Sequence, residues 1–332
     1  MSLLEQYRSW PELLREGFTR GLEVQIDMKK VTKMVLICGV GGSGAVGDLV
    51  RLIAELYGSE VSIEVVKDFS INLKRRIVEP PLVFAISYSG NTVETISCLF
   101  EALREGFPTV VLSSGGVLKE IALKRRFPWI PVRTGLKPRA ALPAMLGGAL
   151  GALTSLDLLP ISEQDVNLTS RRLKELNIES ALEYARAIAE SQITVVASTR
   201  DVSAIAERWK SEIAENSKRV AKLEVYPESA HNDINSWFFF KASVSFIVLE
   251  GWKEFSREAL RIASSIFEKV GRVLRVEVDR SLGGVLEKTL LAGYSSVLAA
   301  QMLGLDPTDT PAIDVYRKEL ERMWKEREGL VL

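Results

Sequence analysis

Short apolar runs alternate with amphipathic helical segments along the chain, and this alternation constrains the fold more than any other feature. The first half contains the runs KMVLICGV, SIEVVKD, LVFAIS, TVVLSS and WIPVR, with helical periodicity between most of them. Continuous apolar runs of this length are typical of strands that are buried on both faces. Strands that alternate with helices form parallel sheets covered by helices. We therefore predict an α/β fold built on doubly wound parallel sheets.

The pattern restarts in the second half of the chain. After Pro160, a polar segment leads to the apolar runs ITVVAS, RVAKLEVYP, VSFIVLEG and VLRVEVD, again with helical segments between them. A proline and a change of composition near residues 157–170 indicate a boundary there. A chain of 332 residues is long enough for two domains of ordinary size. We predict one domain over residues 1–160 and a second, similar one over residues 161–332.

Charge and cysteine content limit the possible partners and the location. Lys plus Arg and Asp plus Glu each number 43, so no global field attracts nucleic acid or an anionic membrane. Cys38 and Cys98 lie in apolar surroundings, which predicts buried thiols in a reducing compartment. The first 18 residues mix acidic and basic side chains and predict an amphipathic helix, not an export signal. We expect a cytoplasmic protein.

One uncharged segment, AALPAMLGGALGALTSL at residues 140–156, resembles a membrane span at first sight. It is shorter than the roughly 20 residues that a span needs. Its bulky residues form a stripe beside small ones, as in Leu142, Leu146, Leu150 and Leu153. We therefore predict a helix that is buried inside the protein.

A glycine-rich loop follows the first predicted strand. In open α/β sheets, ligands bind beyond the carboxyl ends of the strands. The loop GVGGSGAVGD, residues 39–48, has glycines with the G-x-G-x-x-G spacing of dinucleotide-binding proteins. The acidic residue expected about 20 positions later would be Glu64 or Asp68, and neither clearly ends a second strand. The alternative is that the glycines only allow a tight turn between strand and helix.

A second loop, in ISYSGNTVET at residues 86–95, places three hydroxyl groups around a glycine between a predicted strand and a predicted helix. The unpaired N–H groups at a helix start carry partial positive charge, so the hydroxyls and the helix can hold a phosphate together. A single hydroxyl would more simply cap the helix. We predict that a phosphate contacts both loops, at Gly42, Ser43, Ser87, Ser89 and Thr92.

GVGGSG followed by SYSGNTVET resembles the sugar isomerase domain, a flavodoxin-like module that binds phosphosugars. The further motifs PRAALP (138–143), AENSK (214–218), PESAHND (227–233) and DPTDTPAID (306–314) are similar to those of the archaeal bifunctional phosphoglucose and phosphomannose isomerases. The matching motifs extend from about residue 39 to residue 318. The resemblance implies a homodimer of tandem sugar isomerase domains that acts in glycolysis and gluconeogenesis. The resemblance further implies that this homodimer interconverts glucose 6-phosphate, mannose 6-phosphate and fructose 6-phosphate.

The resemblance implies no cofactor, and the residue content agrees. One histidine and two separated cysteines cannot build a zinc site of the usual spacing. Aldose–ketose isomerisation instead requires a base that moves a proton between C1 and C2, a group that opens the sugar ring, and a cation that stabilises the enediolate. The chain offers candidates for each of these roles.

Two candidates lie in the second half of the chain. The resemblance implies that Glu215 is the base; from spacing alone, Glu207, Glu212 and Glu215 are charges on the solvated face of a helix. It also implies that His231, the only histidine, opens the ring and is donated by the neighbouring subunit. The polar segment PESAHNDINSW offers no apolar face that would bury a structural histidine.

Arg139, in KPRAALP, is the cation that the resemblance places near C1 and C2. A guanidinium is charged at every relevant pH, which suits the stabilisation of an oxyanion. A solvated loop arginine is the alternative, and Lys137 is the nearest competitor.

The C-terminal motif departs from the pattern of the family. By resemblance, Thr310 lets the site accept both C2 epimers, and a lysine seven positions later lies near the ring oxygen. The chain has Arg317 at that position and Lys318 next. The two lie about 100° apart on a helix, so only one of them is expected to point into the site. The spacing of the neighbouring apolar residues favours Arg317.

Two other functions stay open at this point. A non-catalytic phosphosugar sensor would carry the same phosphate loop, but it would not require Glu215 and His231. A nicotinamide-dependent dehydrogenase, suggested by GVGGSG, would bind a dinucleotide.

Overall fold

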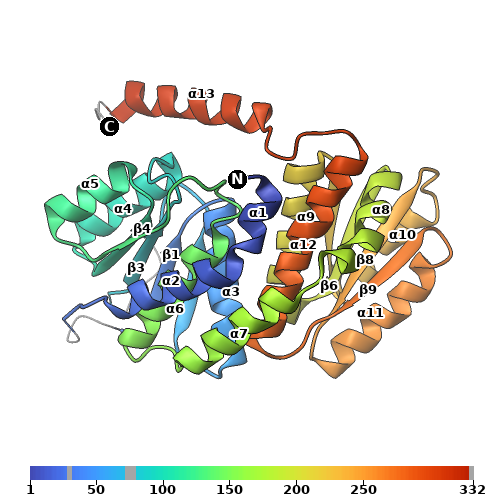
Figure 1. Cartoon of the computed structure of the whole chain (residues 1–332), viewed down its shortest axis with the longest axis horizontal. Coiled ribbons are helices and arrows are strands. Elements are labelled where there is room, and N and C mark those ends of the chain that lie inside the picture. The colour runs from blue at the N-terminus through green and yellow to red at the C-terminus, as the bar shows by residue number, and fades with distance from the viewer. Residues whose placement is uncertain (28–31, 72–79, 329–332) are drawn as a thin grey trace. The chain divides into compact units, whose positions relative to one another are not determined.

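The chain forms two compact units in the computed structural model, which describes residues 1–27, 32–71 and 80–328 (Figure 1). The first-sheet unit comprises Ser9–Ser170 and Thr310–Leu332, and the second-sheet unit comprises Met1–Arg8 and Arg171–Asp309. The division predicted from the sequence, 1–160 and 161–332, differs from these units at three places. Residues 161–170 belong to the first-sheet unit. The N-terminal residues Met1–Arg8 belong to the second-sheet unit, and the C-terminal residues from Thr310 onward belong to the first-sheet unit.

The N-terminal segment shows why the division differs. The single amphipathic helix that we predicted is two helices, α1 (Leu3–Arg8) and α2 (Trp10–Leu22). Pro11, in the first turn of α2, has no N–H and therefore cannot continue the hydrogen bonding of α1. The break leaves α1 in the second-sheet unit, where the Tyr7 hydroxyl donates to the buried carboxylate of Glu212 at 2.5 Å.

The first-sheet unit contains five parallel strands in the order β2-β1-β3-β4-β5. They are β1 (Met34–Cys38), β2 (Ser62–Val66), β3 (Leu82–Ile86), β4 (Thr109–Ser113) and β5 (Trp129–Pro131). Every residue of β3 and β4 is buried, as their continuous apolar sequences predict for strands covered on both faces. All five strands predicted in this half are therefore present.

Helices cover both faces of this sheet. On one face, α4 (Val93–Glu105) and α5 (Gly116–Arg125) bury Leu99 and Leu118 against Val111 of β4. On the other face lie α3 (Gly42–Leu56) and α6 (Leu142–Ser155), and a Cβ on Gly148 of α6 would lie 3.1 Å from Ile130 of β5. This helix–sheet–helix layering is the predicted doubly wound arrangement.

Helix α6 is the uncharged segment that resembled a membrane span. Its residues from Leu142 to Leu153 are all buried, and α2 approaches it so closely that a Cβ on Gly17 would lie 2.1 Å from the Ala144 carbonyl oxygen. The prediction of a helix buried in protein is confirmed. Within the part of the chain described, no helix is long and apolar enough to cross a membrane.

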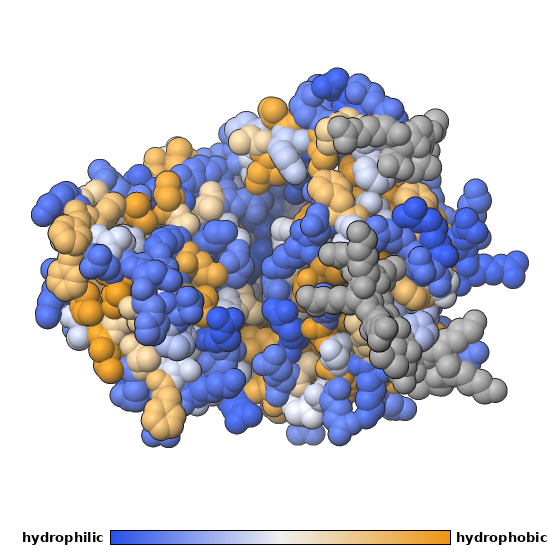
Figure 2. Space-filling model, turned by 180° about the vertical axis from the view of Figure 1, so that it is seen from behind, coloured by the Kyte–Doolittle hydropathy of each residue, from blue (hydrophilic) through white to orange (hydrophobic). Residues whose placement is uncertain are grey.

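On the face drawn in Figure 2, hydrophobic residues are interspersed with hydrophilic ones.

The second-sheet unit repeats the plan with four parallel strands in the order β7-β6-β8-β9. They are β6 (Ile193–Thr199), β7 (Val220–Tyr226), β8 (Val244–Glu250) and β9 (Arg272–Glu277), and the helices around them are α8 (Leu182–Glu190), α9 (Ser203–Glu212), α11 (Glu254–Phe267) and α12 (Leu282–Met302). On one face, Phe267 of α11 stacks on Phe246 of β8 at 4.2 Å between ring centroids. On the other, Ser245 donates to the Ala187 carbonyl of α8 at 3.1 Å. Both predicted doubly wound sheets are therefore confirmed.

Three further helices complete the chain: α7 (Glu163–Glu175), the short α10 (Ile234–Trp237) and α13 (Pro311–Glu328). Helix α13 belongs to the first-sheet unit and is mostly exposed, with Leu320 as its most buried residue.

Candidate active site

The glycine loop between β1 and α3 approaches β3 more closely than a side chain would permit. A Cβ on Gly39 would lie 2.9 Å from the Ile86 carbonyl oxygen. Gly41, with φ of +56°, precedes α3, which begins at Gly42. Ser43 is buried in the first turn of α3, and its Oγ accepts a hydrogen bond from the Tyr88 N–H at 3.3 Å. This bond joins the glycine loop to the SYSGNT loop.

The hydroxyl groups of the SYSGNT loop are linked to one another. Ser87 Oγ and Thr92 Oγ1 are 2.7 Å apart, and the Gly90 N–H donates to Ser87 Oγ at 3.1 Å. Thr92 is the N-cap residue of α4, yet its side chain makes no capping hydrogen bond. The Thr92 hydroxyl therefore does not serve as a helix cap. Ser89 is exposed, and its Oγ accepts from the Asn91 N–H at 3.2 Å.

The two loops lie at the switch point of the first sheet. β1 pairs in parallel with β2 on one side and with β3 on the other. The connection after β1 leads to β2 and the connection after β3 leads to β4, in the opposite direction along the sheet. In such sheets the crevice at the carboxyl ends of these strands is the usual ligand site. The first turns of α3 and α4 both begin there and present backbone N–H groups that favour an anion. The five residues predicted to contact phosphate lie on these two adjacent loops and helix starts.

Arg139 is almost fully buried, at 2% exposure, in the turn that precedes α6. The alternative of a solvated loop arginine is therefore wrong. Tyr88 ties the preceding segment to the SYSGNT loop, since its hydroxyl donates to the Arg133 carbonyl at 3.2 Å and accepts from the Leu136 N–H at 2.8 Å. Burial raises the pKa of Tyr88, and the hydrogen bond from Leu136 opposes this effect only in part. The raised pKa keeps the phenol protonated, so that it can donate a hydrogen bond.

The C-terminal candidates lie at the start of α13. The Thr310 carbonyl accepts the Asp314 N–H at 3.0 Å, and Thr310 itself is partly exposed. Arg317 and Lys318 are both exposed, so their burial does not distinguish them. The role of either residue near a ring oxygen stays a prediction.

Glu215 lies in an unusual piece of helix. At Glu212, α9 passes into a π-helical turn, Ile213–Ser217, and such turns are frequent at functional sites. Glu215 is partly exposed, whereas Asn216 and Ser217 are fully buried. Lys218, with φ of +58°, ends the turn and donates from Nζ to the Glu215 carbonyl at 2.7 Å. The backbone carbonyl of Glu215 is thus held by Lys218.

The expectation of a solvated glutamate face fails at Glu212. Glu207 is a partly exposed residue that pairs with Lys210 at 3.2 Å, but Glu212 is buried and forms an ion pair with buried Arg208. Sequence reasoning missed this pair. Its one signal was the i, i+4 spacing of opposite charges beside the apolar residue Trp209.

His231 is exposed at the end of a 3₁₀ turn, Glu228–His231, that follows β7. The segment after it is anchored by Trp237, whose Nε1 donates to the buried carboxylate of Glu224 at 3.0 Å. Phe238 and Phe239 are 55% and 73% exposed. The histidine thus stands at the surface, and the same segment carries apolar side chains that face solvent.

The structure groups the candidates by unit. The phosphate residues, Arg139, Thr310, Arg317 and Lys318 belong to the first-sheet unit, and Glu215 and His231 belong to the second-sheet unit. Among the residues described, no group of three His, Cys, Asp or Glu side chains could hold a metal ion.

The position of Asp68 bears on the dinucleotide alternative. β2 ends at Val66, so Asp68 follows the second strand by two residues, which the sequence did not make clear. Its Oδ1 accepts the Phe69 N–H at 2.7 Å.

The two parallel sheets share one strand order over four strands, to which the first sheet adds a fifth, and hydroxyl-bearing loops lie at the switch point of the first. This is the architecture of an α/β protein with two sugar isomerase domains. Residues 177–320 match a family model described as the bacterial phospho-glucose isomerase C-terminal SIS domain. The fold is similar to that of the tagatose-6-phosphate ketose/aldose isomerase from Escherichia coli, with a TM-score of 0.71 and 13% identity over 92% of this chain and 93% of that one.

Comparison with curated sequences narrows the class further. The chain is 32% identical to the bifunctional phosphoglucose/phosphomannose isomerase of Aeropyrum pernix, over 95% of this chain and 96% of that protein. It is 34% identical to the protein of the same name from Aquifex aeolicus, over 92% and 97%. The chain belongs to the bifunctional phosphoglucose/phosphomannose isomerase family, and the resemblance found in its motifs is confirmed.

Proposed function

We propose that this protein interconverts glucose 6-phosphate and mannose 6-phosphate with fructose 6-phosphate through a cis-enediol, with Glu215 as the base. Its family makes it an aldose–ketose isomerase and does not favour a non-catalytic sensor of the same fold. The observation that carries the mechanism is the π turn. This turn anchors Asn216 and Ser217 in the core and leaves the Glu215 carboxylate partly exposed. A sensor has no need of a carboxylate that is fixed in this way.

The phosphate of the sugar is held, in this proposal, by Gly42, Ser43, Ser87, Ser89 and Thr92. Two helix starts and linked hydroxyls give N–H and O–H donors for a dianion without a lysine. Because the chain has no net charge, this local arrangement must supply the attraction.

The proton transfer explains how one site serves two epimers. Glu215 removes the proton at C1 of fructose 6-phosphate, and the electron pair of that C–H bond forms the C1–C2 double bond of the enediol. The π pair of the C2 carbonyl moves onto O2, where Arg139 stabilises the negative charge. Glu215 then returns the proton to C2, and the hydroxyl proton of O1 passes to O2, so that the carbonyl forms at C1. Because C2 is planar in the enediol, protonation on one face gives glucose 6-phosphate and on the other gives mannose 6-phosphate. Thr310 would allow both, His231 would open the ring, and Arg317 or Lys318 would act near the ring oxygen.

The proposal is tested by the turnover of fructose 6-phosphate in EDTA, with glucose 6-phosphate and mannose 6-phosphate quantified separately. We expect both products, because the base needs no bound metal. Glucose 6-phosphate alone would limit the protein to one isomerase activity and remove the role of Thr310. Binding of the sugar phosphate without turnover would instead indicate a sensor.

The proposal also includes a cytoplasmic homodimer in which His231 acts on the sugar bound by the partner chain. His231 is exposed, and Phe238 and Phe239 expose large apolar areas seven and eight residues later. Exposed apolar side chains gathered in one segment favour contact with another protein surface. Both cysteines are free and buried, which agrees with a reducing compartment.

Mixing two inactive variants tests the donation of His231. Glu215→Gln and His231→Gln proteins, unfolded together and refolded as a mixture, would form heterodimers in which one of two sites has both residues intact. We expect the mixture to recover up to about a quarter of wild-type activity, because half of the dimers are mixed. The two variants refolded separately are the control. A mixture no more active than this control would show that His231 acts within its own chain.

A further inference from the structure

A buried polar cluster surrounds Glu212, three residues before the proposed base, and the mechanism above does not use it. We call it the Glu212 network; it consists of Tyr7, Arg208, Glu212, Asn216 and Ser296, all in the second-sheet unit. The side chains of Arg208 and Glu212 are 2% and 0% exposed, and an Arg208 N–H donates to Glu212 Oε1. An ion pair so completely removed from water needs an explanation.

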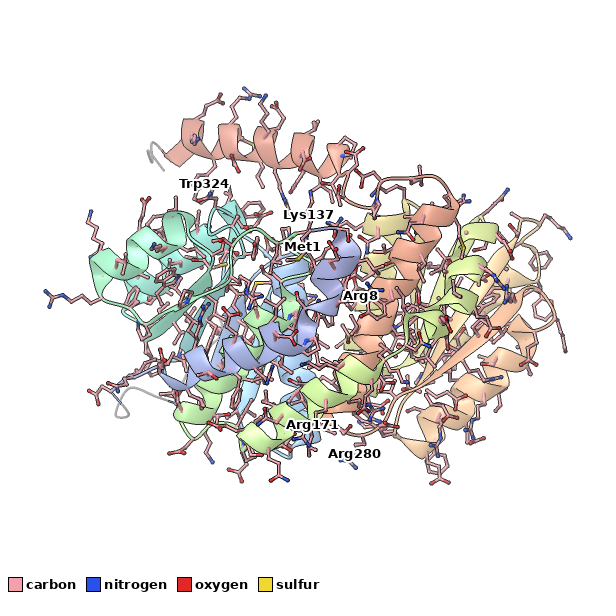
Figure 3. The ribbon with its side chains drawn as sticks, in the orientation of Figure 1. Met1, Arg8, Lys137, Arg171, Arg280 and Trp324 are labelled. Atoms are coloured by element: carbon pink, nitrogen blue, oxygen red, sulfur yellow. The ribbon has the colours of Figure 1, made fainter. Side chains whose placement is uncertain are left out.

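The other carboxylate oxygen of Glu212 accepts hydrogen bonds from two separate parts of the chain. The Tyr7 hydroxyl of α1 donates to Oε2 at 2.5 Å, and the Asn216 amide of the π turn donates to it at 2.7 Å. The same amide donates to Ser296 Oγ of α12 at 2.9 Å. Helix α1 runs beside α12, where the Tyr7 ring meets the Tyr294 ring edge-on at 6.4 Å, and Arg8 marks the end of α1 in Figure 3. Glu212 therefore ties α1 and α9 to the turn that carries Glu215.

Stability alone does not account for this cluster. A buried ion pair is often no more stabilising than apolar side chains of the same volume, because both charges lose their hydration. What the pair provides is a fixed geometry, since each oxygen of Glu212 has its own donors. Asn216, which directly follows Glu215, is one of these donors and is held at both Glu212 and Ser296.

The charge on Arg208 also reaches the proposed base. Burial is the largest single influence and works to lower the pKa of Arg208, but the charges of Glu212, Tyr7 and Glu215 and the hydrogen bond to Glu212 together outweigh it and raise the pKa. The Arg208 guanidinium therefore interacts electrostatically with the Glu215 carboxylate as well as with Glu212.

We propose that Tyr7, Arg208, Glu212, Asn216 and Ser296 are positioning residues that hold the π turn so that the Glu215 carboxylate reaches both C1 and C2 of the substrate. The inference rests on the proposed function, in which Glu215 is the base. A base that serves two carbons in one turnover must stay between them, and a displacement of about 1 Å costs on the order of 100-fold in rate.

Tyr7→Phe tests the proposal with the least disturbance, because it removes only the hydroxyl that donates to Glu212. The matched control is Tyr294→Phe, which removes a hydroxyl from the adjoining ring and leaves the Glu212 network intact. We expect Tyr7→Phe to lower kcat by roughly tenfold or more, with KM for fructose 6-phosphate within about twofold of wild type, since the phosphate is held elsewhere. Tyr294→Phe should change neither constant.

A second readout separates a misplaced base from a loss of folded protein. The reaction is run in D₂O, and NMR measures the share of product molecules that carry deuterium at the carbon that receives the proton. This share is set in each turnover and does not depend on how many molecules are active. We expect it to rise in Tyr7→Phe, because a loosely held base exchanges its proton with water more readily. Ser296→Ala, which removes an acceptor for Asn216, should shift it in the same direction.

Three results would overturn the inference. Tyr7→Phe could behave like Tyr294→Phe, or its kcat could fall while the deuterium share stays at the wild-type value, which would mean fewer active molecules and a structural role alone. Wild-type protein without any turnover would overturn the proposed function and this inference with it, so the two failures are distinguishable.

Discussion

Glu215→Gln is expected to lower kcat for both isomerisations by about 10³-fold while KM for fructose 6-phosphate changes little. Glutamine has nearly the same shape as glutamate and should leave the conformation of the π turn unchanged, but its amide cannot accept a proton at neutral pH. The proposed phosphate donors lie on the SYSGNT and glycine loops, which the substitution does not alter. The measurement is steady-state kinetics with glucose 6-phosphate and mannose 6-phosphate quantified separately.

Glu207→Gln is the matched control, because Glu207 lies on the same helix but is partly exposed and pairs with Lys210. It should leave both constants unchanged. Equal losses of the two products in Glu215→Gln would indicate a single base for both epimers. The assignment would be wrong if one of the two products still formed at the wild-type rate.

Gly90→Ala is expected to destabilise the protein by about 3 kcal/mol and to raise KM at least tenfold. Gly90 has φ of +74°, and a Cβ at this position would lie 1.9 Å from the Gly115 carbonyl oxygen. Since the obstacle is backbone, the SYSGNT loop and the turn before α5 must move apart. This displaces Ser87 and Thr92, whose hydroxyls are 2.7 Å apart. Chemical denaturation gives the change in unfolding free energy, and kinetics gives KM.

Gly106→Ala separates the two causes of that loss. Gly106, after the last turn of α4, has φ of +70° and nothing within 4 Å of an added Cβ. The substitution should therefore cost only the backbone strain, about 1 kcal/mol, with KM unchanged. If both variants lost the same stability and kept the same KM, the close approach at Gly90 would have no part in holding the phosphate.

Local features of the fold were predictable because their causes are local. A strand covered on both faces must be apolar throughout, so β3 and β4 were visible as LVFAI and TVVLS. The hydroxyls of Ser87 and Thr92 were visible as part of one loop, because the two residues lie five positions apart in the sequence. Helix α6 was recognised as buried because its length rules out a membrane span.

Other features depend on partners that are distant in the sequence. Glu212 looked like a surface glutamate, and the Tyr7 hydroxyl that completes its burial lies 205 residues away. The break between α1 and α2 is signalled by Pro11, but the unit with which α1 packs is not. The burial of Arg139 likewise depends on the surrounding fold and not on KPRAALP itself.

The amino-acid sequence alone determined the alternation of strands and helices, the two loops that we propose bind phosphate, and the family, because periodicity, turn residues and motif spacing act over a few neighbouring residues. Only the tertiary structure decided which glutamates are solvated, that Arg139 is buried, and that α1 and α13 join units formed by the other half of the chain. The physical reason is desolvation: the state of a charged side chain depends on everything that replaces water around it, and those groups come from the whole chain.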